Sequence, residues 1–157
     1  MFFFVFFRWN ELDCETLLVD PQGEVYLISR GQPGISSARL AHVPSSGWNS
    51  GNTVLLTNLV NLNLPLTGND PTGGDISPDG RELLLITHDK MYHCILPGGN
   101  VIESLTRTDP VIVPYIVEPK GEAVAWDYHG NGYFTLGKGH DQTLYYYRRI
   151  KETDVVG

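Results

Sequence analysis

The chain has 157 residues, a net charge of −7 and two cysteines. The acidic balance, with lysine and arginine nowhere clustered, excludes a basic nucleic-acid surface, and two cysteines are too few for a disulfide framework. The 17 glycines and 10 prolines are spread along the chain, which is typical of short strands joined by tight turns. The sequence leaves open whether Cys14 and Cys94 pair.

Residues 1–10 form an atypical apolar segment that contains the run Phe2–Phe7. A bilayer takes about 20 apolar residues to cross, so we predict no membrane span and interpret this segment as a β-rich edge or as a sign that the start of the chain is truncated. It lacks the basic start and small-residue cleavage site of a secretory signal. The compartment is therefore left open, and the protein would be extracellular if its full gene encodes a signal peptide.

Ten short strands are predicted from β-branched and aromatic residues bounded by turn residues. The run Leu83–Ile86 is apolar on both faces, as expected for a strand buried between two layers. One helix of at most two turns is predicted at Asn100–Thr106, and residues 151–157 are predicted to be a flexible tail. The sequence therefore predicts an all-β fold. The ten strands are Thr16–Val19, Glu24–Ser29, Ala38–His42, Thr53–Asn58, Glu82–Thr87, Met91–Leu96, Val111–Ile116, Ala123–Trp126, Gly132–Leu136 and Thr143–Arg148.

A unit of two strands joined by a four-residue turn ending in glycine occurs three times. The turns are Asp20-Pro21-Gln22-Gly23, Ser77-Pro78-Asp79-Gly80 and Asp127-Tyr128-His129-Gly130. Proline presets φ to about −65° at the second turn position, glycine accepts a positive φ, and a side chain such as that of Asp20 or Ser77 can cap the turn. We therefore predict that five residues are structural residues of hairpin corners: Pro21, Gly23, Pro78, Gly80 and Gly130.

A repeat of roughly 40–50 residues with up to four strands is the sequence signature of a β-propeller blade. Three blades are predicted, at about 11–64, 65–117 and 118–150, the third without its fourth strand. Because propellers have about four to eight blades, the prediction is a partial β-propeller of about three antiparallel blades. The chain would be part of a larger propeller, an assembly completed by self-association, or an incomplete gene product.

Three groups of segments resemble the C-terminal part of a poorly characterised, often secreted, β-propeller family. Their blades are similar to those of phytase/esterase-like and WD40-like propellers. The resemblance covers about residues 11–148 and implies architecture without an agreed activity. Where relatives often carry Ser-Glu-Gly, this chain has Gly137-Lys138-Gly139, so a lysine replaces a carboxylate. The segments are Asp13–Pro21 with Val25–Ser29, Thr72–Glu82, and Glu118–Trp126 with Gly132–Thr135 and Leu144–Tyr147.

Carboxylates stand near the start of the first strand of each unit: Asp13, Glu15, Asp75 and Glu122. In a propeller the first strand lines the central channel, so these side chains could converge at a channel mouth as candidate ligand-binding residues. Carboxylate oxygens suit Ca²⁺, which makes calcium the one metal or cofactor that the sequence indicates. The alternative is that they cap turns or accept hydrogen bonds from a neighbouring blade's backbone.

The sequence shows no identifiable catalytic constellation. It has no nucleophile elbow and no phosphate-binding loop, and turn chemistry explains the pairs His88-Asp89 and His140-Asp141. The main hypothesis is therefore a β-propeller binding or scaffold module for an unknown protein, small-molecule or carbohydrate ligand. One alternative is a Ca²⁺-dependent phosphoester or ester hydrolase of the phytase-like propeller type, in which the ion would activate water. Another is a non-functional partial copy of a larger propeller protein.

Overall fold

The computed structural model describes residues 6–8, 13–31, 34, 37–45, 53–56, 59–65, 68 and 70–150. The all-β prediction is confirmed, with one short α-helix, α1 (Val101–Arg107), and a 3₁₀ turn at Pro97–Gly99. Within these described ranges no helix is long and apolar enough to cross a membrane. The strands are β1 (Phe6–Arg8), β2 (Cys14–Val19), β3 (Val25–Ser29), β4 (Arg39–Val43), β5 (Thr53–Leu55), β6 (Leu59–Asn61), β7 (Gly73–Ile76), β8 (Glu82–Ile86), β9 (Met91–Ile95), β10 (Val111–Val113), β11 (Gly121–Trp126), β12 (Gly132–Gly137) and β13 (Tyr145–Arg148).

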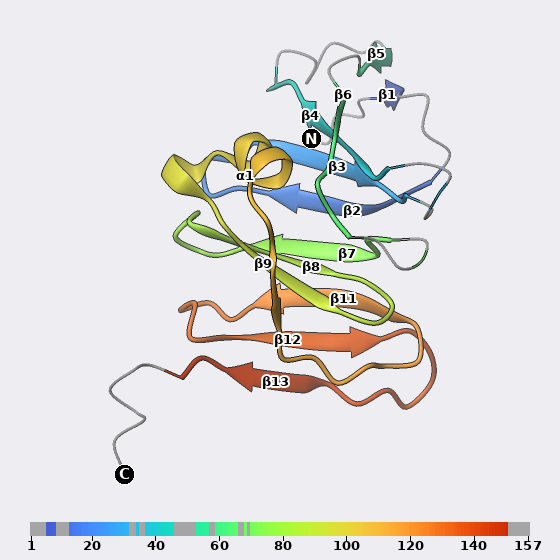
Figure 1. Ribbon diagram of the computed structural model, residues 1–157, viewed down its shortest axis with the longest axis vertical. Helices are drawn as coiled ribbons and strands as arrows, with labels where there is room; N and C mark the ends of the chain where they lie inside the picture. The colour runs from blue at the N-terminus through green and yellow to red at the C-terminus, as the bar shows by residue number, and fades with distance from the viewer. Residues whose placement is uncertain are drawn as a thin grey trace, which may run out of the picture.

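Three antiparallel sheets are stacked in chain order (Figure 1). The first sheet has the strand order β2-β3-β4-β6, the second β7-β8-β9-β10 and the third β11-β12-β13. The short strands β1 and β5 pair in parallel beside the first sheet. Of the predicted apolar segment 1–10 only β1 is described, and the predicted tail 151–157 lies outside the described residues.

The first strands of the three sheets, β2, β7 and β11, run in the same direction and lie side by side (Figure 1). Two glycines allow this close approach. A Cβ atom on Gly73 would lie 2.5 Å from the carbonyl oxygen of Glu122, and one on Gly74 would lie 3.0 Å from a methyl group of Leu18. Side chains at these two positions would force the three sheets apart.

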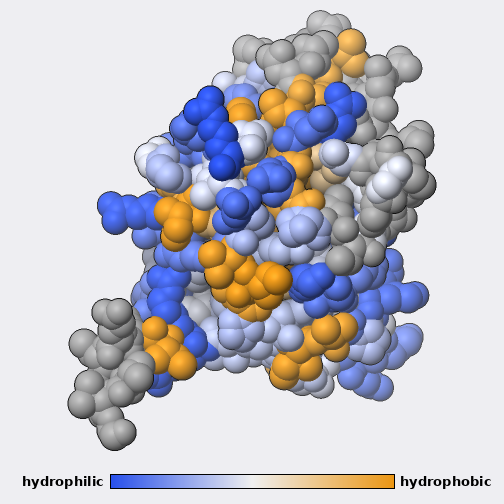
Figure 2. Space-filling model, viewed as in Figure 1, coloured by the Kyte–Doolittle hydropathy of each residue, from blue (hydrophilic) through white to orange (hydrophobic). Residues whose placement is uncertain are grey.

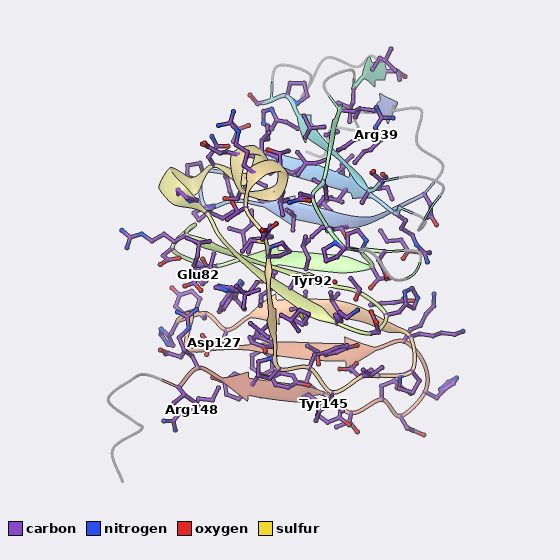
Figure 3. All side chains as sticks on the ribbon, viewed as in Figure 1. Arg39, Glu82, Tyr92, Asp127, Tyr145 and Arg148 are labelled. Carbon is purple, nitrogen blue, oxygen red and sulfur yellow. The ribbon has the colours of Figure 1, made fainter. Side chains whose placement is uncertain are left out.

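We call the face of a sheet that contacts the next sheet its forward face, and the opposite face its rear face. Two apolar cores fill the two spaces between sheets, and β8 contributes Leu83 and Leu85 to one and Leu84 and Ile86 to the other. Its burial on both faces agrees with the sequence prediction. Tyr92, also buried in the first core (Figure 3), donates its hydroxyl to the Pro65 carbonyl at 3.0 Å.

The three glycine turns form equivalent hairpin corners. The N–H of each glycine donates to the carbonyl of the first turn residue at 2.8–3.0 Å, and φ is +85° at Gly23, +70° at Gly80 and +67° at Gly130. The first turn residue caps the corner, since Asp20 Oδ1 accepts from the N–H of Glu24 at 2.8 Å. The local chemistry of these turns therefore positions the three hairpins alike.

The element boundaries differ from the prediction where tertiary contacts or proline decide them. The ten predicted strands include neither β6, which forms because it pairs with β4, nor β7, which was expected only as the first strand of the second repeated unit. The strand expected at Val111–Ile116 ends at Val113, because Pro114 has no N–H to donate. The expected helix begins one residue later, with Asn100 as its N-cap accepting from the Glu103 N–H.

Apolar side chains also reach the surface over the second and third sheets (Figure 2). Val111 and Ile112 of the outer strand β10 are both exposed. The two cysteines are both free. Cys14 is exposed at the start of β2, and Cys94 is buried in β9, so no disulfide contributes to this packing.

Candidate functional site

Three of the four predicted ligand carboxylates form ion pairs with cationic side chains. Arg30, directly after β3, reaches Asp13 at 3.2 Å and Glu15 at 2.9 Å through Nη1. Glu122 lies 3.4 Å from Nζ of Lys138, the lysine that replaces a carboxylate in the resembled pattern. Each of these carboxylates thus has a cationic partner within the protein, and Asp13 and Glu15 share the single charge of Arg30.

The fourth carboxylate, Asp75, connects two sheets. Its Oδ2 accepts a hydrogen bond from the backbone N–H of Trp126 at 2.7 Å, which joins β7 to β11. Such a bond to a neighbouring backbone is the alternative to a metal site that the sequence left open. In the described part of the chain no three His, Cys, Asp or Glu side chains gather as a metal site, and calcium binding at Asp13, Glu15, Asp75 and Glu122 stays a prediction.

Replacing Asp75 with asparagine is expected to stabilise the protein at neutral pH. Burial raises the pKa of the Asp75 carboxyl above its ordinary 3.8, so the folded state binds this proton more tightly than the unfolded state. The stability linked to this proton is present below pH 3.8 and is lost as the pH rises through the folded pKa. Asparagine keeps an acceptor for the Trp126 N–H without a charge. Urea unfolding should show a more stable variant at pH 7, with a smaller advantage at pH 3.

A matched control for this prediction is Asp79→Asn. The Ser77 hydroxyl donates to Asp79 at 2.6 Å and lowers the pKa of that carboxyl, so its charged form favours folding. The expected change in stability therefore has the opposite sign, and Asp79→Asn should be less stable than the wild type at pH 7. A loss at pH 7 for both variants would contradict the burial argument for Asp75.

A histidine–carboxylate pair occurs where the sequence analysis expected turn chemistry only. The partner of His88 is Asp70, which is fully buried, and its Oδ1 lies 2.8 Å from Nδ1 of His88 and 3.0 Å from its backbone nitrogen. The two residues are 18 positions apart. Sequence spacing offered no signal for this pair, because Asp70 reaches β8 only through the sheet-to-sheet connection.

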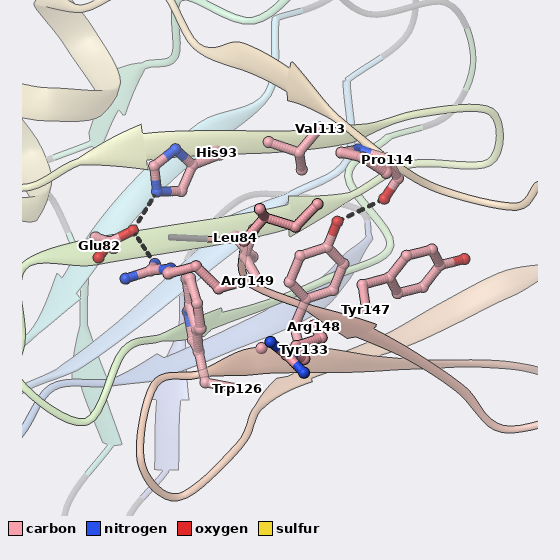
Figure 4. A pocket seen from close by; sticks show the side chains of 12 residues that line it. Glu82, Leu84, His93, Val113, Pro114, Trp126, Tyr133, Tyr147, Arg148 and Arg149 are labelled. Carbon is pink, nitrogen blue, oxygen red and sulfur yellow. Dashed lines mark hydrogen bonds and ion pairs between the residues drawn. The ribbon is translucent and has the colours of Figure 1, made fainter. Parts of the chain in front are cut away.

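A pocket of about 650 Å³ lies between the second and third sheets and opens to solvent (Figure 4); we call it the aromatic pocket. Its walls come from β8, β9, the end of β10, β11, β12, β13 and the residues after β13. The lining is mostly apolar, with one cluster of charged groups. The lining includes Glu82, Leu84, His93, Val113, Trp126, Tyr133, Tyr147 and Arg149.

The aromatic wall of the pocket is held in place by hydrogen bonds. Tyr133 stacks on Tyr147 with ring centres 4.9 Å apart and meets Trp126 edge to face at 6.1 Å. The Tyr133 hydroxyl donates to the Pro114 carbonyl at 2.5 Å, and the Tyr147 hydroxyl accepts from the Ile116 N–H at 2.7 Å. Burial raises the pKa of Tyr133 to about 12, so this ring stays a neutral phenol. The wall is therefore preformed.

The charged end of the pocket is organised by Glu82. One of its carboxylate oxygens lies 2.6 Å from Nε2 of His93 and 2.5 Å from Nη2 of Arg149 (Figure 4). The Arg149 guanidinium also lies 5.1 Å from the centre of the Trp126 ring, a cation–π arrangement. A guanidinium has five N–H donors, so Arg149 can donate to a ligand while Glu82 and Trp126 hold it in place.

The Glu82–His93 pair has a counterpart on the first sheet. Glu24, just before β3, lies 2.6 Å from Nε2 of His42 on β4. Glu24 directly follows its hairpin corner, and Glu82 follows its corner after Arg81. The backbone carbonyl of each accepts from the N–H of the first turn residue. This repeated glutamate was the sequence signal that could have indicated the site, whereas Arg149, 67 residues from Glu82, gave none.

The sequence matches no family model, and no curated protein matches it either.

Proposed function

We propose that the three sheets are consecutive blades of a β-propeller, and that the chain is a binding module with the aromatic pocket as its ligand site. The blade assignment is supported by the side-by-side first strands and by the way successive corners interlock. A Cβ on Gly80 would lie 3.2 Å from the Pro21 ring, and one on Gly130 would lie 4.0 Å from the Pro78 ring. The same contact thus relates the first sheet to the second and the second to the third.

The observation that carries the binding role is the preformed pocket between the second and third sheets. Its volume of about 650 Å³ falls in the range of small-molecule sites, roughly 300–1,000 Å³. Such sites combine apolar and aromatic walls with a few placed polar groups. Here Trp126, Tyr133 and Tyr147 supply the walls, and the cluster of Glu82, His93 and Arg149 supplies the polar groups.

The chemistry of the pocket favours a small molecule with a flat ring system and a carboxylate-like acceptor. A flat ring fits against aromatic side chains in offset or edge-to-face contact. The acceptor would take N–H donors of Arg149, whose charge Glu82 already partly balances. The apolar lining favours this ligand class over a sugar, which would present hydroxyl groups to Leu84 and Val113.

The test is an NMR titration of the full chain with 2-naphthoate. We expect saturable shifts of the Trp126 indole and of the Tyr133 and Tyr147 signals. The variant Val113→Trp fills the pocket and should weaken binding by about tenfold or more. Ile112→Trp is its matched control, since Ile112 lies on the same strand, is 59% exposed and does not line the pocket.

Two further ligands separate the contributions of the ring and the acceptor. The neutral analogue 2-naphthalenemethanol should bind more weakly than 2-naphthoate, because it offers Arg149 no charge. Cellobiose should bind more weakly than both. Equal binding of 2-naphthoate to Val113→Trp and the wild type would overturn the pocket as the site, and tighter binding of cellobiose would overturn the ligand class.

A further inference from the structure

The forward faces of the three sheets carry side chains at equivalent positions. In the ladders, Tyr26 pairs with His42, Leu84 with His93 and Phe134 with Tyr146. Two residues further along the same strands stand Ile28, Ile86 and Leu136. Ile28 and Ile86 are fully buried because the next sheet covers them, whereas Leu136 is 38% and Tyr146 46% exposed. The third forward face thus repeats a packing surface without its cover.

The hairpin corners show the same pattern. Two contacts between successive corners are formed, and at each end of the stack one corner has no described neighbour. Pro21 lies against Gly80 and Pro78 against Gly130. The residue at this turn position in the third sheet is Tyr128, which is 87% exposed. At the other end of the stack, the Cβ position of Gly23 has no described atom within 4 Å. The third sheet therefore presents the protruding side chain of Tyr128. The first sheet presents, at Gly23, a position that no described atom fills and that such a side chain could occupy.

The rear face of the first sheet is covered where β4 lies, since Ala41 and Val43 are buried there with Leu56, and it is apolar and exposed only beside its first strand. Leu17 and Val19 of β2 are 58% and 48% exposed. In the second and third sheets, the positions equivalent to Val19, counted back from the corner, are Ile76 and Trp126, which pack against the preceding sheet. Near the first strands, each end of the stack thus exposes one of two surfaces. The same two kinds of surface already meet between the first and second sheets and between the second and third sheets.

We propose that two copies of this chain associate head to tail, with the third forward face of one copy on the first rear face of the other. Tyr128 of each copy then lies against Gly23 of its partner, as Pro21 lies against Gly80 within the chain. Two copies contribute six sheets, within the usual range of about four to eight blades, and a head-to-tail contact gives a ring when the rotation between copies closes. The proposal rests on the blade relationship and is independent of ligand binding in the aromatic pocket.

The test is disulfide cross-linking in a Cys14→Ser background, which leaves only the buried Cys94. A mixture of Tyr128→Cys and Gly23→Cys chains should form a covalent dimer on mild oxidation, because a disulfide needs Cβ atoms about 3.5–4.5 Å apart. The control mixes Tyr128→Cys with Gly34→Cys. Gly34 also has a positive φ and no described atom within 4 Å, but it lies beyond the other end of β3. We expect about tenfold more dimer with Gly23→Cys than with Gly34→Cys.

Sedimentation velocity on the wild-type chain supplies a second measurement. We expect a dimer that Leu17→Glu and Leu136→Glu each convert to monomer, since head-to-tail contact uses both faces. A wild-type chain that stays monomeric at all concentrations would overturn the proposal. The proposal would also be overturned if Tyr128→Cys chains cross-linked only to one another and Leu17→Glu left the dimer intact. Titration with 2-naphthoate would still succeed in either case, so failure here is distinguishable from failure of the pocket.

Discussion

Replacing Gly73 with valine is expected to cost about 3 kcal/mol or more of unfolding free energy, at or above the upper end of typical overpacking. The Cβ position of Gly73 lies 2.5 Å from the Glu122 carbonyl oxygen and 3.1 Å from a methyl group of Ile86. The first obstacle is backbone, which cannot move away by changing a rotamer. The third sheet would therefore have to shift as a whole, which would disrupt the core between the second and third sheets.

The matched control for Gly73→Val is Ala123→Val. Gly73 pairs with Ile86 and Ala123 with Leu136, so the two residues occupy equivalent positions in successive sheets. Ala123 is exposed, because the structure places no described sheet in front of it. Urea unfolding at concentrations where the chain is monomeric should show a change within about 0.5 kcal/mol for Ala123→Val. Similar losses at both sites would show that valine itself, rather than the contact with Glu122, is responsible.

The features that the sequence predicted well are those determined by a few neighbouring residues. The corners at Gly23 and Gly80 follow from proline, glycine and a capping side chain within one turn. The helix after Asn100 follows from its N-cap. β6 was missed because its strand conformation comes from pairing with β4, about 20 residues earlier, while its one asparagine, Asn61, is typical of turns.

The candidate site was less predictable because its parts are far apart in the sequence. Tyr147 was visible only as one of three consecutive tyrosines, and the strand alternation decides that Tyr147 enters the pocket while Tyr146 lies on the opposite face. The carboxylates Asp13 and Glu15 were placed at the correct end of β2, but their partner Arg30 reaches them only because β3 folds back on β2. Charge pairing between strands depends on register, which no local pattern revealed.

The second large effect is expected for Ile86→Ala, which should cost about 2–5 kcal/mol. Ile86 is fully buried in the core with Met91 and Val124, so truncation removes apolar contacts and leaves a cavity that the surrounding sheets cannot fill. Chemical denaturation should show the loss as a lower midpoint with an unchanged slope. A loss below about 1 kcal/mol would mean that the second and third sheets do not pack tightly there.

The comparison with Leu136→Ala extends this test to the open end of the stack. Leu136 occupies the position equivalent to Ile86 and is 38% exposed, so its truncation should cost less than about 1 kcal/mol in the monomer. Where the proposed dimer forms, the loss of unfolding free energy caused by Leu136→Ala should rise with protein concentration. The reason is that the dimer buries this face, so that unfolding also requires dissociation. A small cost that stays constant with concentration would mean that the third forward face remains exposed to water. A large cost in the monomer would mean instead that Leu136 is already buried without a partner.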